Sequence, residues 1–236
     1  MTRETARGRH TRELILDAAE RLWSERGVAG VSLREIRIAA GQRNSSALQF
    51  HFAGRDGLLL ALAERHLPRV AEIQDQLWAA VVADGREHDP AGLVEVLVAP
   101  QADYLRRGPS ERAWVIVVAE QATRPDLALE EVASRVPPVA REAGARLYDH
   151  LRGFLPPRLA VERLVAVTSA GSHLCADRAR LEGAGLDAAR SVLPFARWRA
   201  NLLAMATGAL LEVAPGVRSG RAGVAARGPS PASGAP

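Results

Sequence analysis

The chain has 236 residues, and its 47% of hydrophobic and 25% of charged residues are typical of an ordinary soluble globular protein. All 31 basic residues are arginine, which excludes a Walker-type phosphate loop, a Schiff base and a Ser-Lys dyad, because each of these sites needs a lysine. The formal net charge of +4 is unevenly spread along the chain. Residues 1–55 hold ten arginines and six acidic residues, whereas residues 56–213 hold 18 arginines and 21 acidic residues. This distribution fits an N-terminal segment that binds a polyanion.

The first predicted helix spans residues 11–26. Thr11 is a suitable N-cap, and Arg26-Gly27 is a suitable C-terminal stop. One face of this helix is apolar and carries Leu14, Ile15, Ala18, Ala19, Leu22 and Trp23. Residues 1–10, with Arg3, Arg7 and Arg9, are expected to form a basic arm that either holds nucleic-acid phosphates or stays solvated.

A pair of short helices follows. The sequence Ser32-Leu33-Arg34-Glu35 is a capping box, in which the Ser32 side chain binds the amide of Glu35 and the Glu35 side chain returns the bond. Gly41 ends this helix, and a third helix is expected from about residue 44 to residue 50. Two short helices around a turn glycine, behind a longer helix, predict a helix-turn-helix over about residues 33–52.

In a helix-turn-helix the second short helix lies in the major groove of DNA, while the first crosses the phosphate backbone. The start of the second helix is rich in side chains that can bind base edges, namely Arg43, Asn44, Ser45 and Ser46, with Gln49 one turn later. Ser32 and Arg34, on the first helix of the pair, complete the predicted DNA contacts. The alternative is a solvated helix start with Asn44 or Ser45 as its cap.

The rest of the chain has apolar residues at three- and four-residue spacing, which predicts further helices. One starts at Arg55, and Pro68 is expected to kink or end it. Others are predicted at about 69–83, 91–107, 111–123, 126–135, 138–152, 158–181 and 187–212. Pro100 and Pro194 are expected to bend or split two of these. Residues 214–236 are mostly Ala, Gly, Pro and Ser, which predicts a disordered tail.

An ordered set of motifs at the front of the chain resembles the DNA-binding domain of TetR-type transcriptional repressors. The set comprises Leu14-x3-Ala18-Ala19-x2-Leu22, Glu25-Arg26-Gly27, Ser32-x3-Ile36, Ala40-Gly41 and His51-Phe52-x2-Arg55 followed by Leu58. The resemblance implies that His51 and Arg55 contact phosphates. It also implies an all-α protein with a helix-turn-helix domain over residues 11–56 and a helical ligand-binding and dimerisation domain over residues 57–213, which releases DNA when a small molecule binds.

The chain also departs from this family pattern. Arg37 stands in the second helix where such proteins usually have a small residue, and it is expected to project its charged head outward. One extra residue lies between Ala40-Gly41 and His51-Phe52, and the aromatic expected three places before Phe52 is instead Phe50. Arg37 and the longer turn favour an alternative: a helical ligand-binding or protein-interaction module that has lost DNA binding.

No motif indicates an enzyme. The six histidines show no His-Glu-x-x-His or similar spacing, and a single cysteine cannot form a cysteine-clustered zinc site, so neither a metal nor a cofactor is expected. His173 and Cys175 lie two residues apart on a predicted helix and point to different faces, so they cannot act as a base and a nucleophile. Ala170-Gly171-Ser172 is interpreted as a stretch that permits close helix contact.

The candidates for a ligand pocket in the second domain are Trp78, Tyr104, Trp114, Glu120 and Tyr148. The alternative is that the aromatic residues belong to the core. These observations predict an all-α, ligand-responsive transcriptional regulator, most simply a repressor. The alternative is an activator or a regulator without an effector.

The expected partners are double-stranded DNA with a palindromic operator, an unknown small-molecule effector and a second copy of the chain. The two copies are expected to meet through helices 158–181 and 187–212, unless these are the buried helices of a monomer. Because no run of 18 or more apolar residues appears, no membrane partner is expected, and the predicted location is cytoplasmic.

Overall fold

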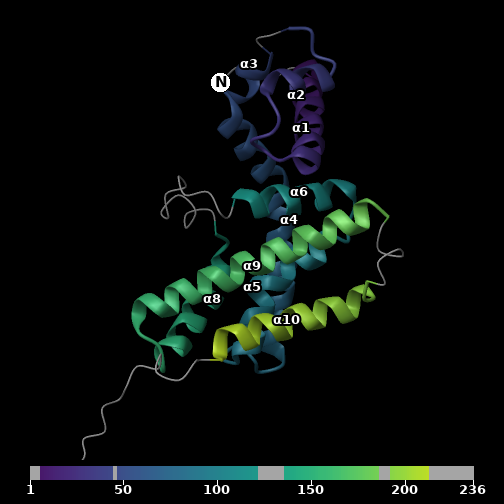
Figure 1. Ribbon diagram of the computed structural model, residues 1–236. Helices are drawn as coiled ribbons and strands as arrows, with labels where there is room; N and C mark the ends of the chain where they lie inside the picture. The colour runs from purple at the N-terminus through teal and green to yellow at the C-terminus, as the bar shows by residue number, and fades with distance from the viewer. Residues whose placement is uncertain (1–5, 45–46, 122–135, 186–191, 213–236) are drawn as a thin grey trace, which may run out of the picture.

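The computed structural model describes residues 6–44, 47–121, 136–185 and 192–212, and the regular structure in these ranges is α-helical throughout. In chain order the helices are α1 (Ala6–Arg26), α2 (Leu33–Ala39), α3 (Ala47–Phe52), α4 (Arg55–Ala83), α5 (Pro90–Tyr104), α6 (Pro109–Gln121), α8 (Pro138–Arg152), α9 (Pro157–Gly183) and α10 (Phe195–Leu211). We call α1–α3 the N-terminal unit and α4–α10 the body. Figure 1 shows the N-terminal unit at one end of the molecule, with α4 leading from it into the body. The predicted all-α fold is confirmed.

The first helix is longer than predicted. α1 begins at Ala6, so Thr11 lies inside the helix and is not its N-cap. Arg7 and Arg9 are therefore helical, and the prediction of an arm over residues 1–10 is wrong for residues 6–10. Alanine and arginine have high helix propensity and no proline interrupts this stretch, so the helix extends over it. Arg3 lies outside the described residues.

The capping box at the start of α2 is confirmed. The Glu35 amide donates to the Ser32 hydroxyl oxygen at 3.2 Å, and the Ser32 amide donates to the Glu35 carboxylate at 2.8 Å. The Ser32 hydroxyl and the Arg26 guanidinium also donate to this carboxylate, each at 2.7 Å. These bonds, first those from Ser32 and then that from Arg26, lower the pKa of Glu35 to about 2. The end of α1 and the start of α2 are thus held together.

The third helix starts later than predicted. α3 begins at Ala47, so Arg43 and Asn44 precede it and do not form its first turn. The Arg37 guanidinium donates to the carbonyl oxygens of Gln42 at 2.6 Å and of Arg43 at 3.2 Å. Both carbonyls lie in the turn that separates α2 from α3, and the Arg37 side chain of α2 binds them there. The predicted outward projection of Arg37 is therefore wrong.

The prolines at 68 and 100 do not end their helices. α4 runs from Arg55 through Pro68 to Ala83, and α5 runs through Pro100 to Tyr104. Proline lacks an N–H, so in α5 the Val96 carbonyl cannot receive its usual bond from position 100. The Gln74 side-chain amide of α4 donates to this carbonyl at 2.9 Å. A neighbouring helix thus replaces the missing donor and helps to keep α5 continuous.

The later helices agree with the prediction except at α10. This helix begins at Phe195, and Pro194 precedes it, so the predicted start at residue 187 and a proline inside the helix are both wrong. Proline commonly precedes or opens a helix, because the backbone N–H groups of the first turn have no acceptor within the helix and a missing N–H there costs no hydrogen bond. The helix predicted at 126–135 and the tail at 214–236 lie outside the described residues.

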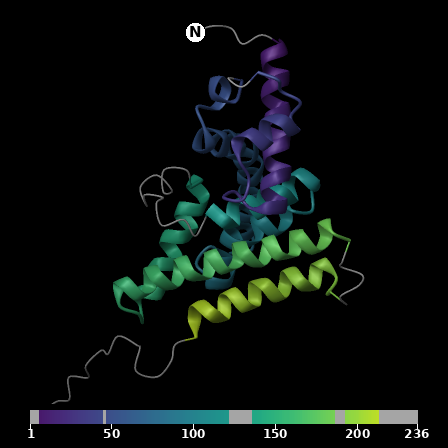
Figure 2. The same ribbon diagram turned by 45° about the horizontal axis from the view of Figure 1, so that its top comes forward.

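The core of the body lies around α5, which contacts α4, α8, α9 and α10. Gly171 of α9 allows a close approach to α5, because a Cβ at this position would lie 3.1 Å from Val98 Cγ1. The predicted close helix contact at this stretch is confirmed. Figure 2 shows α9 and α10 side by side along one edge of the body. In the part of the chain that the structure describes, none of the helices has the length and apolar character needed to cross a bilayer.

Candidate nucleic-acid interface

The connection between α3 and α4 fixes the position of α3. Leu48 and Phe52, one helical turn apart, are both buried, so α3 has a single inward face. Ala53 has a φ of 53° and Gly54 has a φ of 123°, and these left-handed residues turn the chain sharply into α4. A Cβ at Gly57 would lie 1.7 Å from the Phe52 carbonyl oxygen, so only glycine lets the first turn of α4 pass this close to α3.

The outer side of α2 and α3 is polar and basic. Arg34, Arg43, Asn44 and Gln49 are exposed here. A hollow of about 530 Å³ lies between the two helices and is lined by Leu33, Arg34, Arg37, Leu48 and Gln49. Residues 27–54 contain three arginines and one acidic residue, and that acidic residue, Glu35, is bound by Arg26. This side of the N-terminal unit therefore carries an excess of positive charge.

The structure brings most of the predicted DNA contacts together in the N-terminal unit. The exposed ones are Arg34 on α2, Arg43 and Asn44 in the turn, and Gln49 on α3. His51 is half-buried near the end of α3. The Ser32 hydroxyl is occupied in the capping box. Ser45 and Ser46 lie outside the described residues.

Arg55 has a structural contact that the sequence did not indicate. It is the first residue of α4, and its guanidinium donates to the carbonyl oxygens of Val28 and, at 2.9 Å, of Val31. These carbonyls belong to the link between α1 and α2. A guanidinium has five N–H donors, so contacts with two carbonyls do not use all of them. The predicted phosphate contact of Arg55 stays a prediction.

Residues 15–62 match the family profile described as "Bacterial regulatory proteins, tetR family". This segment contains the capping box, α2, α3 and the first turns of α4. The N-terminal unit is thus similar to the helix-turn-helix domain of TetR-family regulators.

Two known repressors are similar to part of the chain. The HTH-type transcriptional repressor AcnR of Corynebacterium glutamicum is 32% identical over 81 residues, which are 34% of this chain and 43% of AcnR. AcnR of Corynebacterium efficiens matches to the same extent. The match thus spans less than half of these repressors.

Among solved structures, CprB from S. coelicolor is 26% identical and superimposes with a TM-score of 0.43, over 85% of this chain and 96% of CprB. A tetR-family regulatory protein from Rhodococcus RHA1 is 17% identical with a TM-score of 0.47, over 85% of this chain and 96% of that protein.

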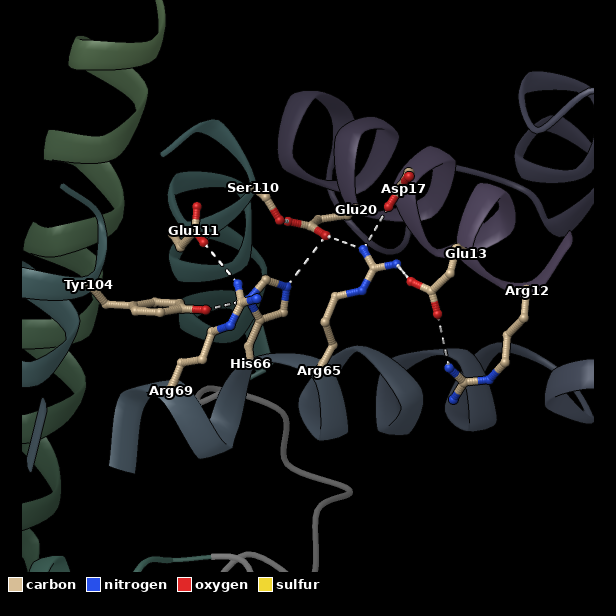
Figure 3. A network of polar contacts seen from close by, with 10 residues as sticks. All are labelled: Arg12, Glu13, Asp17, Glu20, Arg65, His66, Arg69, Tyr104, Ser110 and Glu111. Carbon is tan, nitrogen blue, oxygen red and sulfur yellow. Dashed lines mark hydrogen bonds and ion pairs between the residues drawn. The ribbon is translucent and has the colours of Figure 1, made fainter. Parts of the chain in front are cut away.

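A buried polar network joins the N-terminal unit to the body (Figure 3). Glu20 of α1 is 3% exposed and accepts hydrogen bonds from Ser110 of α6 at 2.7 Å and from Arg65 of α4 at 3.2 Å. Arg65 also pairs with Asp17 at 2.7 Å and with Glu13, both on α1. Because charged groups inside a protein need partners, this network fixes α1 against α4 and α6.

His66 lies at the centre of the same network. It is fully buried, with Nε2 3.4 Å from the Glu20 carboxylate and Nδ1 2.7 Å from the Tyr104 hydroxyl oxygen. Its ring stacks on Trp114, with the two ring centroids 5.0 Å apart. Burial raises the pKa of the Tyr104 hydroxyl. Two of the predicted pocket residues, Tyr104 and Trp114, therefore meet around this histidine.

The link between α1 and α2 is held from the body as well. The Val28 amide donates to Glu120 Oε2 of α6 at 2.9 Å, while the Val28 carbonyl accepts from Arg55. Glu120 also lies 3.9 Å from the Arg180 guanidinium of α9. Both polar backbone groups of Val28 are thus bound by helices of the body. Glu120 was predicted as a pocket residue, and this contact with the α1–α2 link had no signal in the sequence.

The other two predicted pocket residues are Trp78 and Tyr148. Trp78 is partly buried, and the Arg146 guanidinium lies 5.2 Å from the centre of its ring. Tyr148 is partly buried against the core. None of the five candidates lines the hollow between α2 and α3. The pocket stays a prediction.

Proposed function

We propose that the chain is a transcriptional repressor that binds a palindromic operator as a homodimer and leaves it when a small molecule binds the body. The observation that carries the proposal is the TetR-family helix-turn-helix domain, which presents α3 on an outer surface with an excess of positive charge. Positive charge supplies most of the affinity of a protein for DNA, since each neutralised phosphate releases counterions. The proposed place of action is the cytoplasm.

The predicted site residues divide into two groups by position. Arg43, Asn44 and Gln49 flank or lie on α3 and are proposed to read base edges, together with Ser45 and Ser46. The other group comprises Arg34, His51 and Arg55, which are proposed to contact the phosphate backbone. Ser32, whose hydroxyl and amide both donate to Glu35, is proposed to act by holding the start of α2 in place. Phosphate contacts set the position of the domain, and base contacts select the sequence.

A dimer is supported by apolar side chains left on the surface of α9 and α10. Val161 and Val165 lie one turn apart on α9, and Met205 lies on α10, and each is about half exposed. These two long helices run side by side (Figure 2), so together they offer a broad surface. Burial of apolar area against a second copy would be favourable, at about 25 cal/mol per Å². A two-fold dimer also doubles the DNA contacts on a palindromic site.

The contacts between the domain and the body support regulation by a ligand. Glu20, Arg65 and Ser110 connect α1 to α4 and α6, and Glu120 connects α6 to the α1–α2 link. A ligand that binds one arrangement of α4 and α6 more tightly than another changes the population of domain orientations. We propose that such a shift changes the spacing of the two recognition helices.

The proposal includes no catalytic activity. Cys175 is buried, and burial raises the pKa of its thiol to about 12, so it offers little thiolate nucleophile. Among the residues with described positions, no group of three or more His, Cys, Asp or Glu side chains is arranged to hold a metal.

Fluorescence anisotropy with DNA flanking the gene tests the proposal. The full chain should bind one DNA segment far more tightly than unrelated DNA at the same salt concentration. Arg43→Ala or Asn44→Ala should weaken this binding by about 1–3 kcal/mol and relax the sequence preference. Arg141→Ala, at an exposed arginine of α8, is the matched control and should leave the affinity unchanged. Equal, weak binding to every DNA would instead support a module that has lost DNA binding.

A further inference from the structure

The outward face of α3 carries an exposed phenylalanine. Phe50 is 84% exposed, the largest fraction among the large apolar side chains that the structure describes. Leu48 and Phe52, the residues two before and two after it, are both buried. Because successive residues of a helix are rotated by about 100°, Phe50 points away from the face that packs on the domain.

Water is an unfavourable environment for this ring. Its ring contacts that of His51, with the ring centroids 5.1 Å apart in an edge-on arrangement. The long helices α9 and α10 do not cover Phe50, since α3 lies at the far end of the molecule from them (Figure 1). Covering such a ring with a partner would be favourable, because it removes apolar area from water.

The charge around Phe50 identifies the kind of partner. Arg34, Arg37 and Arg43 lie on α2 and in the turn beside α3, and Glu35, the acidic residue of this segment, is bound by Arg26. An apolar ring on a helix that lies next to positively charged residues fits a polyanion with apolar groups on its surface. The major groove of DNA is such a surface, because each thymine exposes a C5-methyl group between the phosphate backbones.

We propose that Phe50 is a specificity-determining residue that packs its ring against a thymine methyl group in each half of the operator. This inference rests on the proposed function, because it assumes that α3 enters the major groove. Phe50 has no hydrogen-bonding group, so it cannot read a base through donors and acceptors. It therefore selects thymine over cytosine, adenine and guanine through the methyl group alone. The polar residues beside it, Gln49 and Asn44, read the neighbouring positions.

Deoxyuridine provides a direct test, because it differs from thymidine only by the C5-methyl group. An operator is first selected from random DNA with the full-length protein, and each thymine of a half-site is then replaced in turn by deoxyuridine. Affinity is measured by fluorescence anisotropy at a fixed salt concentration. At one position, replacement of thymine by deoxyuridine should weaken the binding of the wild-type protein by about fourfold per half-site. This factor corresponds to about 0.8 kcal/mol for one buried methyl group.

The variants separate the role of the ring from a general loss of binding. Phe50→Ala should bind thymine and deoxyuridine operators equally, and Phe50→Leu should keep part of the difference. Val82→Ala, at an exposed apolar residue of α4, is the matched control and should show the full difference. The salt dependence of binding should be the same for all four proteins, since no phosphate contact is removed. Because Phe50 is exposed, its variants should melt at the wild-type temperature.

The outcomes distinguish this inference from the proposed function. Selection of an operator, followed by a wild-type response that is the same at every deoxyuridine position, would overturn the role of Phe50 and leave the repressor proposal intact. An equal deoxyuridine effect in wild type and Phe50→Ala would also overturn it. Failure to select any sequence would overturn the proposed function itself. Binding of the wild-type protein to anionic lipid vesicles, lost in Phe50→Ala, together with a flat deoxyuridine response, would show that the ring contacts a membrane instead.

Discussion

The bond between Gln74 and the Val96 carbonyl should be required only because residue 100 is a proline. Gln74 is 5% exposed and Val96 is fully buried, so water does not reach this carbonyl. Gln74→Leu removes the donor and keeps a side chain of similar size. Leaving a buried carbonyl without a partner costs about 1–3 kcal/mol. For a chain of this length, a loss of 1 kcal/mol lowers the melting temperature by roughly 2–4 °C, so we expect a fall of about 2–12 °C.

A double-mutant cycle tests the reason for this loss. Pro100→Ala restores a backbone N–H at position 100, which can donate to the Val96 carbonyl within α5. In this background Gln74→Leu should cost at least about 1 kcal/mol less than in the wild-type chain, because the carbonyl keeps a donor. Urea unfolding followed by circular dichroism at 222 nm gives the four stabilities. All proteins must be compared at one concentration, since a dimer gains stability by mass action.

The cycle has a clear negative result. Equal costs of Gln74→Leu in the two backgrounds would show that the amide does not replace the proline donor. A lack of any destabilisation in the wild-type background would show that the Val96 carbonyl has another partner. Either outcome would refute the account of how α5 continues through Pro100.

Three further predictions concern single groups. Glu120→Ala should destabilise the chain by about 1–2 kcal/mol because the Val28 amide loses its acceptor, whereas Glu120→Gln, which keeps an acceptor oxygen, should melt near the wild-type temperature. The pKa of Glu35 is lowered from 4.5 to about 2, so its stabilising effect is complete above pH 4.5 and is lost as the pH falls toward 2. The stability difference between wild type and Glu35→Gln should therefore shrink between pH 4.5 and pH 2, and a constant difference would contradict this prediction. The buried Cys175 thiol, with a pKa raised to about 12, should react with Ellman's reagent only after denaturation, and rapid reaction of the native protein would show that this part of α9 opens.

The sequence predicted the fold class and most helices because local patterns decide them. The Ser32–Glu35 capping box and the apolar face of α1 are local, and both are present in the structure. The error at Pro100 occurred where a side chain from another helix changes the local preference. A proline inside a helix usually weakens it, which is why Pro68 and Pro100 were expected to interrupt their helices. In α5 the compensating donor, Gln74, comes from another helix. No pattern within one segment can reveal such a donor.

The candidate site shows the same limit. The motifs located the helix-turn-helix, whereas the exposure of Phe50 between the buried Leu48 and Phe52 became evident only in the folded chain. The contacts of Arg55 and Glu120 with the α1–α2 link join residues that are 27 and 92 positions apart in the sequence. Their partners are backbone atoms, which have no sequence signature. The structural roles of these two residues therefore required the folded chain.

Arg37 and the longer turn are two departures from the family pattern, and the structure explains them together. An extra residue between α2 and α3 adds backbone that the helix bonds do not use, and its carbonyls must find other donors. Arg37 donates to two of these carbonyls, those of Gln42 and Arg43. A small residue at position 37 could not reach them. The large residue thus compensates for the longer turn and keeps α3 in a defined position. A helix-turn-helix that no longer contacted DNA would have no need of such a compensation, so the pair of departures favours a domain that still presents its recognition helix.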